Sequence, residues 1–223
     1  MATNIRDQED ALFTEWEKIL PKRGDKIARD GVVDESEYNN KRKTKYKLVF
    51  VLKRPHDDEA WDLRSFLKGG GHGVTWNNIV RWAQGLLCVD EELQWEHLEG
   101  KNKERRMEYL PKICVVNLEK TPSKEYAEKS DISDAVDKYG RFLRRQFELY
   151  EPDITICCGT GGEFDQLYND RSYAWKETTG KIKYVNDNGK IIIKYKSPLA
   201  REYDQDLYDD LINAAKEIFC ELY

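Results

Sequence analysis

Short apolar runs, separated by segments with helical periodicity, constrain the fold of this 223-residue chain more than any other feature. The runs span residues 46–53, 112–118 and 154–158, and each is a continuous apolar run of strand length. Strands of this kind are buried on both faces, as in a parallel sheet whose connections are helices. The pattern therefore predicts a three-layer α/β/α sandwich with a mainly parallel central sheet.

The segments around these runs predict amphipathic helices. Apolar side chains recur at helical spacing over residues 11–20, 61–67, 75–87 and 131–147, and again after residue 203. Asp57 or Asp58 is in a position to cap the second of these helices.

A hairpin is expected near the C-terminal end. Asn188 and Gly189 lie between two strand-like runs, residues 181–185 and 190–195. An Asn-Gly pair supplies the positive φ values that a tight hairpin turn needs. We expect a single domain over residues 1–223, made of an N-terminal helical extension (1–44), a core (46–200) and a C-terminal helix (201–223).

The composition of the chain limits the classes of protein to which it can belong. The chain is 39% hydrophobic and 12% aromatic, enough for a core without disulfide or metal support. No window approaches about 18 consecutive apolar residues, and residues 1–10 lack the layout of a secretory signal. The five cysteines show no C-x-x-C spacing, so we expect reduced cysteines, no metal and no cofactor. These features favour a soluble cytoplasmic protein.

Charge is unevenly spread along the chain. The net charge of −5 argues against a wholly electrostatic nucleic-acid binder. Residues 41–53 nevertheless carry six cations and no acid, whereas residues 202–221 are acidic. The basic run either faces DNA or is a solvated surface.

The expected sheet places four loops together. Ligands of open α/β sheets bind beyond the carboxyl ends of the strands. Residues 54–58, 117–122, 159–164 and 195–199 follow the predicted strands and should meet in one cleft.

These loops, in this order, resemble those of the uracil-DNA glycosylase superfamily. Residues 115–122 (VVNLEKTP) resemble the family's base-reading strand, and residues 142–159 (FLRRQFELYEPDITICCG) resemble its helix, Pro-Asp turn and third strand. The resemblance covers about residues 46–200. It implies the family fold, DNA as partner and hydrolysis of the N-glycosidic bond of an altered base in DNA repair.

The sequence also departs from the family pattern. The family's first loop usually carries Asp, Asn or Glu, and the matching position here is Arg54. The loop that resembles His-Pro-Ser reads Tyr195-Lys196-Ser197, so the matching His is absent. The cysteine set of the iron–sulfur branches is missing too, and no iron–sulfur cluster is expected.

Cleavage of an N-glycosidic bond builds positive charge on the sugar and negative charge on the departing base. Asp57 and Asp58 are the carboxylates nearest the predicted cleft, with helix capping as the alternative role. Lys196 and Tyr195 are the candidate donors to the base anion. The resemblance assigns base reading to Asn117, whose amide must otherwise bond the backbone.

Two further groups complete the candidate site. Trp76 and Phe164 could stack on a base that has left the duplex, although core packing is the alternative for both. Lys53, Arg54, Lys120 and Ser197 are the candidate contacts to the DNA backbone. A non-catalytic module that binds a nucleobase or nucleic acid on the same scaffold is the alternative function. The N-terminal extension and the charged residues 89–106 leave room for a protein partner.

Overall fold

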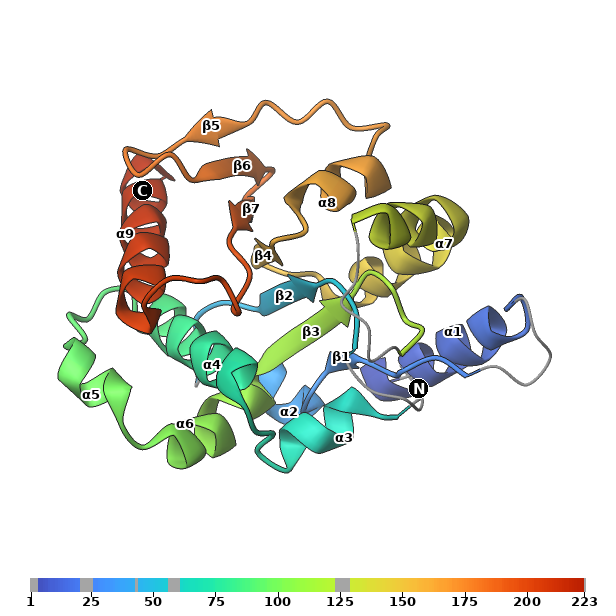
Figure 1. Cartoon of the computed structure of the whole chain (residues 1–223), viewed down its shortest axis with the longest axis horizontal. Coiled ribbons are helices and arrows are strands. Elements are labelled where there is room, and N and C mark those ends of the chain that lie inside the picture. The colour runs from blue at the N-terminus through green and yellow to red at the C-terminus, as the bar shows by residue number, and fades with distance from the viewer. Residues whose placement is uncertain (1–3, 21–25, 43, 56–60, 123–128, 223) are drawn as a thin grey trace.

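The computed structural model describes residues 4–20, 26–42, 44–55, 61–122 and 129–222. Within these residues one sheet has the strand order β1-β3-β2-β4-β7-β6-β5 (Figure 1). The strands are β1 (Gly31–Val32), β2 (Leu48–Leu52), β3 (Ile113–Asn117), β4 (Ile154–Cys158), β5 (Lys176–Glu177), β6 (Lys183–Asp187) and β7 (Lys190–Tyr195).

The centre of the sheet is parallel. β2 pairs in parallel with β3 and β4, and β4 pairs in parallel with β7. Phe50 lies opposite Val115 on one side and Ile156 on the other. The antiparallel pairs are β1 with β3, β5 with β6, and β6 with β7. The parallel centre expected from the apolar runs is thus confirmed.

Helices cover both faces of this sheet. The longer helices are α1 (Ile5–Glu17), α4 (Val74–Leu87), α6 (Asn102–Tyr109), α7 (Lys129–Tyr150) and α9 (Asp204–Leu222). The shorter ones are α2 (Glu35–Tyr38), α3 (Leu63–Lys68), α5 (Trp95–Glu99), α8 (Gly161–Leu167) and the 3-10 turn η1 (Leu110–Lys112).

Alternate strand residues point into two separate cores. Leu48 and Phe50 belong to the core under α4 and α9, whereas Val49 and Val51 belong to the core under α1, α7 and α8. Figure 1 shows these two groups of helices on opposite sides of the sheet. Because both faces are covered, the strands are apolar at successive positions. The described residues form the expected three layers.

The start of α3 differs from the prediction. α3 is capped by Asp62, whose Oδ1 accepts a hydrogen bond from the backbone N of Ser65 at 3.1 Å. Asp57 and Asp58, the expected caps, lie outside the described residues. Asp62 directly precedes the first helical residue, where its carboxylate reaches the free backbone N–H groups of the first turn.

The predicted hairpin is confirmed. β6 and β7 pair from Lys183 opposite Lys194 to Asp187 opposite Lys190. Asn188 and Gly189 form the turn with φ angles of 55° and 85°. These left-handed values suit the turn that matches the twist of the two strands.

The N-terminal residues are built into the layers. α1 packs Leu12, Phe13 and Trp16 into the core on the α7 side. β1 extends the sheet beside β3 through Gly31 and Val32. The sequence predicted only a helical extension here, because a two-residue strand leaves no periodic signal. Among the described helices, none is both long and apolar enough to cross a lipid bilayer.

Candidate nucleic-acid interface at the carboxyl rim

The turns that leave the parallel strands meet at one edge. Backbone N of Glu119 donates to O of Lys53 at 2.9 Å, which joins the β3 turn to the β2 turn. Oγ1 of Thr160 donates to O of Val51 at 3.0 Å, and this bond joins the β4 turn to β2. Backbone N of Gly159 donates to O of Tyr195 at 2.7 Å and joins the β4 and β7 turns.

We call this edge the carboxyl rim. It consists of residues 52–55, 73–74, 117–122, 158–162 and 195–203. The meeting of the four loops that the sequence predicted is therefore seen in their described parts. Asp57 and Asp58, the candidate carboxylates of the first loop, lie outside the described residues.

Asn117 ends β3 at this rim, but its nitrogen atoms are bound inside the protein. Its backbone N and its Nδ2 both donate to Oδ2 of Asp30, at 2.7 and 3.0 Å. Asn117 is only 1% exposed. The sequence left two partners open for this amide, the backbone or a ligand, and the structure supplies a third, a carboxylate 87 residues away.

Lys120 is buried as well, which does not agree with a contact to a DNA backbone. Its Nζ lies 2.6 Å from Oδ1 of Asp30. Burial lowers the pKa of Lys120, and the charge of Asp30 acts in the opposite direction. Nε2 of Gln146 donates to the same Oδ1 at 2.8 Å. The side chain of Lys120 therefore forms an ion pair in the protein interior and does not face a ligand.

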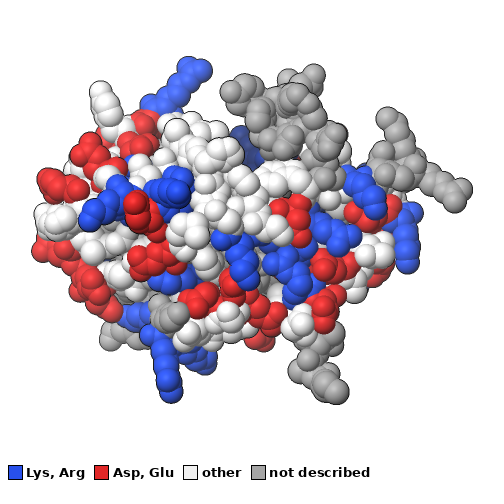
Figure 2. Space-filling model, turned by 90° about the horizontal axis from the view of Figure 1, so that it is seen from below, with Lys and Arg blue, Asp and Glu red and all other residues white. Residues whose placement is uncertain are grey.

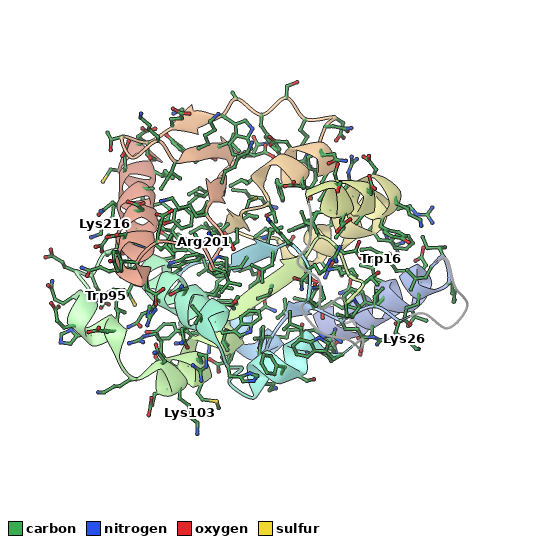
Figure 3. The ribbon with its side chains drawn as sticks, in the orientation of Figure 1. Trp16, Lys26, Trp95, Lys103, Arg201 and Lys216 are labelled. Atoms are coloured by element: carbon green, nitrogen blue, oxygen red, sulfur yellow. The ribbon has the colours of Figure 1, made fainter. Side chains whose placement is uncertain are left out.

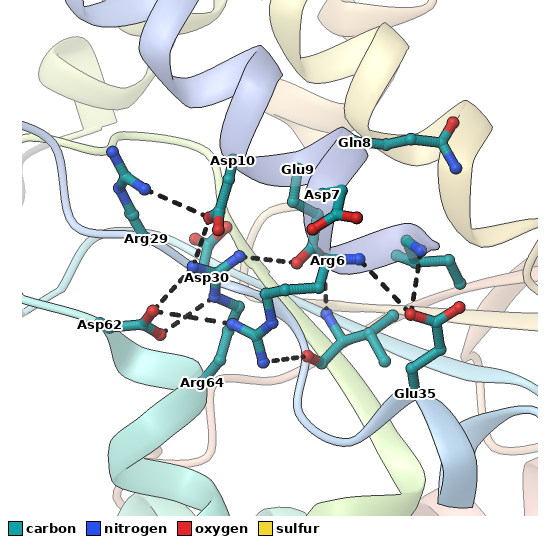
Figure 4. Close-up of polar contacts among 12 residues, drawn as sticks. Arg6, Asp7, Gln8, Glu9, Asp10, Arg29, Asp30, Glu35, Asp62 and Arg64 are labelled. Carbon is teal, nitrogen blue, oxygen red and sulfur yellow. Dashed lines mark hydrogen bonds and ion pairs between the residues drawn. The ribbon is translucent and has the colours of Figure 1, made fainter. Parts of the chain in front are cut away.

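A second buried ion pair lies beside this one. Oε2 of Glu9 lies 2.7 Å from Nη1 of Arg64, and Oε1 of Glu9 accepts from the backbone N of Val32 at 2.9 Å. Figure 4 shows Arg64 among Glu9, Asp10 and Asp62. Burial raises the pKa of Glu9, although Arg64 and the Val32 N–H lower it. These pairs fasten α1 and β1 to the edge of the sheet that carries Asn117.

The candidate donors of the β7 turn are also engaged. Oη of Tyr195 donates to O of Leu207 at 2.5 Å, and burial raises the pKa of this phenol. Nζ of Lys196 lies 2.5 Å from Glu202 and 3.0 Å from Asp210. The hydrogen bond with Glu202 raises the pKa of Lys196.

The two candidate stacking residues lie differently. Phe164 is buried and packs edge-on against Phe147 at 5.6 Å between ring centroids, in the core under α7 and α8. The structure therefore favours the core alternative for Phe164. Trp76 is half-buried against the other core, near the start of α4. A stacking role for Trp76 stays a prediction.

The backbone-contact candidates at the rim are accessible to different degrees. Lys53 is exposed. Nη2 of Arg54 lies 3.0 Å from Asp131, and Nε of Arg54 has no hydrogen-bond partner among the described residues. Oγ of Ser197 accepts from the backbone N of Leu199 at 3.2 Å. Nε of Arg54 is itself buried, so of these two cations Lys53 offers the donor that an anionic ligand could reach.

The structure adds an apolar feature to the rim that the sequence analysis missed. Leu199 is 58% exposed and Tyr203 is 82% exposed. Nδ2 of Asn78 donates to O of Pro198 at 2.9 Å, so the turn packs on α4. Val74, one helical turn before Asn78, is 54% exposed. The side chains that reach solvent could not be told apart in the sequence from those that pack inward.

Two hollows are found away from the rim among the described residues. A hollow of about 260 Å³ lies elsewhere, between residues 91–96 and α9. Another hollow, of about 550 Å³, is lined by Glu37 and residues of α6 and η1. In the described part of the chain, no group of three or more His, Cys, Asp or Glu side chains is placed to hold a metal ion.

The basic run of residues 41–53 is divided by the fold. Lys45 and Lys47 precede β2 and lie at the amino end of the sheet, whereas Lys53 follows β2 at the carboxyl rim. Lys45 lies 2.5 Å from Asp90, and Lys47 lies 4.0 Å from Glu151. Figure 2 shows a face on which both charges are interspersed. A strand about 17 Å long thus separates the two parts of the run, and the choice between a DNA-facing and a solvated surface stays a prediction for each part.

The fold and the rim define an α/β protein with a parallel centre to its sheet and a carboxyl edge that carries charges of both signs and exposed apolar side chains. A scan against models of known protein families gives no match. A Leuconostoc mesenteroides protein described as Holliday junction resolvase RecU is 32% identical to this chain over 87 residues. The similarity covers 38% of this chain and 43% of that protein, so the chain matches less than half of the relative's length.

Proposed function

We propose that this chain binds nucleic acid at its carboxyl rim. The observation that carries the proposal is the exposed Leu199 on a turn that also carries Ser197 and the exposed Arg201. Proteins that contact the grooves of DNA often insert an apolar side chain between base steps while neighbouring cations bind phosphates. Figure 3 places Arg201 beside the end of β7.

The other side chains of the rim suit the same ligand. Lys53 is exposed at the end of β2. Tyr203 and Val74 extend the apolar surface around Leu199. The similarity to a protein described as a Holliday junction resolvase supports DNA as the nucleic acid.

The test is a binding titration of the whole chain with labelled duplex, single-stranded and four-way-junction DNA. Leu199→Ala should weaken binding to duplex or junction DNA by about 5- to 30-fold, since it removes a wedge worth roughly 1–2 kcal/mol. Met107→Ala is the matched control, because Met107 is 48% exposed on α6, away from the rim. Equal losses in both variants, or no binding by the unmodified chain, would overturn the proposal.

A second proposal is the reaction that the family resemblance implies, hydrolysis of the N-glycosidic bond of an altered base. It is favoured by the four parallel strands in the order β3-β2-β4-β7 and by Asn117 at the carboxyl end of β3. The enclosed nitrogen atoms of Asn117 and the engaged phenol of Tyr195 favour binding over hydrolysis.

Oligonucleotides that contain uracil, hypoxanthine, mismatches or alkylated bases, treated with alkali after incubation, test the second proposal. Strand breaks that are lost in Asp57→Asn or Asp58→Asn, with binding retained, would support hydrolysis. Binding without breaks on every substrate would leave the non-catalytic module as the function.

A further inference from the structure

Cations and aromatic rings lie in contact with one another along the surface between α7 and β7. We call this set the cation–aromatic row, and its members in spatial order are Arg144, Tyr168, Arg171, Tyr173, Trp175 and Lys194. Most of these residues belong to the segment between α8 and β5, which has no helix or strand of its own. The row is therefore formed mainly by one loop that is tied at both ends to the sandwich.

Each neighbouring pair in the row is in contact. The guanidinium carbon of Arg144 lies 5.8 Å from the ring centroid of Tyr168, and that of Arg171 lies 5.0 Å from the same centroid. Tyr173 is hydrogen-bonded to Arg171.

The residues at the other end of the row are also in contact with one another. The rings of Tyr173 and Trp175 are 5.7 Å apart and meet edge to face. Nζ of Lys194 lies 3.9 Å from the Trp175 centroid. Such contacts fix the planes of the rings and the positions of the charges before any ligand arrives.

The cations of the row are held by carboxylates that solvent reaches. Arg171, 53% exposed in its side chain, lies 2.8 Å from Asp187. Arg144 lies 3.4 Å from Asp170, whose side chain is 62% exposed. Exposed ion pairs contribute little to stability, so an incoming phosphate can replace the carboxylate at small cost. A guanidinium can then bind the phosphate through two parallel N–H groups.

One end of the row adjoins the carboxyl rim. Lys194 is the second-last residue of β7, and the rim residues 195–203 follow it directly. α8 begins directly against Lys194, because a Cβ on Gly161 would lie 2.7 Å from Cγ of Lys194. Lys194 thus lies against rim residue Gly161 at one end and against Trp175 of the row at the other.

We propose that the cation–aromatic row binds a single strand of nucleic acid that continues from the carboxyl rim. The inference rests on the proposed binding of nucleic acid at the rim. Stacking of bases on aromatic rings, combined with cations along the backbone, is how proteins hold single strands without reading their sequence. The row contains both components, and its three rings are half-buried against the core on the α7 side, which leaves part of each ring accessible.

The test is a titration of the whole chain with labelled oligothymidylate and with a labelled duplex. Trp175→Ala should weaken binding of the single strand by about 5- to 150-fold, and Trp175→Phe should restore most of it. Arg171→Gln should lower the salt dependence of single-strand binding by about 0.7 in the log–log slope, the value for one lost phosphate contact. Binding of duplex should change little in all three variants.

Trp95→Ala is a matched control. Trp95 is also half-buried and has the guanidinium of Arg81 5.2 Å from its ring, but it lies on the α5 side of the molecule (Figure 3). Its neighbours include Glu91, Glu92 and Glu96, which repel phosphate. A loss in Trp95→Ala equal to that in Trp175→Ala would mean a general effect on folding and would overturn the proposal.

Photo-crosslinking gives a direct second measurement. Oligothymidylate substituted with 5-iododeoxyuridine should crosslink to Tyr173 or Trp175, as located by mass spectrometry of the digested chain. Crosslinks only outside residues 168–175, or unchanged single-strand binding in Trp175→Ala and Arg171→Gln, would overturn the row as a binding track while leaving the rim proposal intact. Failure of the unmodified chain to bind any nucleic acid would overturn both.

Discussion

Asp30 binds both nitrogen atoms of Asn117 with a single oxygen atom, at 2.7 and 3.0 Å. Its other oxygen atom lies 2.6 Å from Nζ of Lys120. Asp30 therefore joins β3, the turn after β3 and the segment before β1 at a fully buried point.

Removal of Asp30 should be strongly destabilising. Asp30→Ala leaves the charge of Lys120 buried without a partner, and we expect a loss of about 3–5 kcal/mol in the free energy of unfolding. Urea unfolding followed by circular dichroism measures it. Asp206→Ala, at an exposed position on α9, is the control and should change the free energy of unfolding by less than about 0.5 kcal/mol.

The double variant Asp30→Leu/Lys120→Met tests whether the two charges of this pair are energetically coupled. Removing both charges abolishes the uncompensated charge, so the double variant should be more stable than Asp30→Leu alone. Losses that simply add would show that the two side chains are not coupled.

Gly31 should not accept a side chain. Its φ is +130°, and a Cβ there would lie 2.0 Å from Oε1 of Glu9 and 2.5 Å from Oη of Tyr150. We expect Gly31→Ala to cost about 2–4 kcal/mol, since it combines backbone strain with displacement of a buried carboxylate. Gly189, with φ of +85° and no atom within 4 Å of the added Cβ, is the matched control. Gly189→Ala should cost only the strain of about 1–2 kcal/mol. Equal losses of thermal stability would contradict the prediction.

Asp34 should make stability depend on pH in the acid range. The hydrogen bond from Lys68 and that from Ser36 lower the pKa of Asp34 to about 2. A carboxyl whose pKa is depressed in the folded state stabilises the fold above its unfolded pKa, near 3.8, and this stabilisation is lost as pH falls through about 2.

Asp34→Asn keeps an acceptor for the first turn of α2 but removes the charge that Lys68 binds. The unmodified chain should be the more stable of the two at pH 7, and the difference should shrink below about pH 4 and vanish only below about pH 2. Thermal unfolding across this range measures it. A constant difference at every pH would show that the charge of Asp34 has no part in stability.

The two parts of the basic run should differ in any binding to DNA. Lys53→Gln, at the carboxyl rim, should reduce the log–log salt slope for duplex binding by about 0.9. Lys41→Gln and Arg42→Gln, exposed at the amino end of the sheet, should leave the slope unchanged. The reverse result would place the DNA at the amino end and contradict the rim as the binding surface.

Much of the sheet could be predicted because its signals are local. The apolar runs place β2, β3 and β4 within two residues of their observed ends, and Asn188-Gly189 places the β6–β7 hairpin. α8 was missed because it opens with Gly161-Gly162, which read as a turn.

The environment of the candidate site could not be predicted, because it depends on contacts between distant residues. Asp30 lies 87 residues before Asn117, and nothing in either local sequence indicates the other. Lys120 and Phe164 follow strands as rim residues would, yet both side chains turn inward. The direction of a side chain in a turn is set by the whole fold rather than by its neighbours in sequence.

The buried ion pairs also impose an order on biosynthesis. Glu9 and Asp30 emerge from the ribosome long before Arg64 and Lys120, the cations that neutralise them in the folded state. A nascent chain must keep Glu9 hydrated until residue 64 has been translated and Asp30 hydrated until residue 120 has been translated, so the packing around Asp30 is completed only late in synthesis.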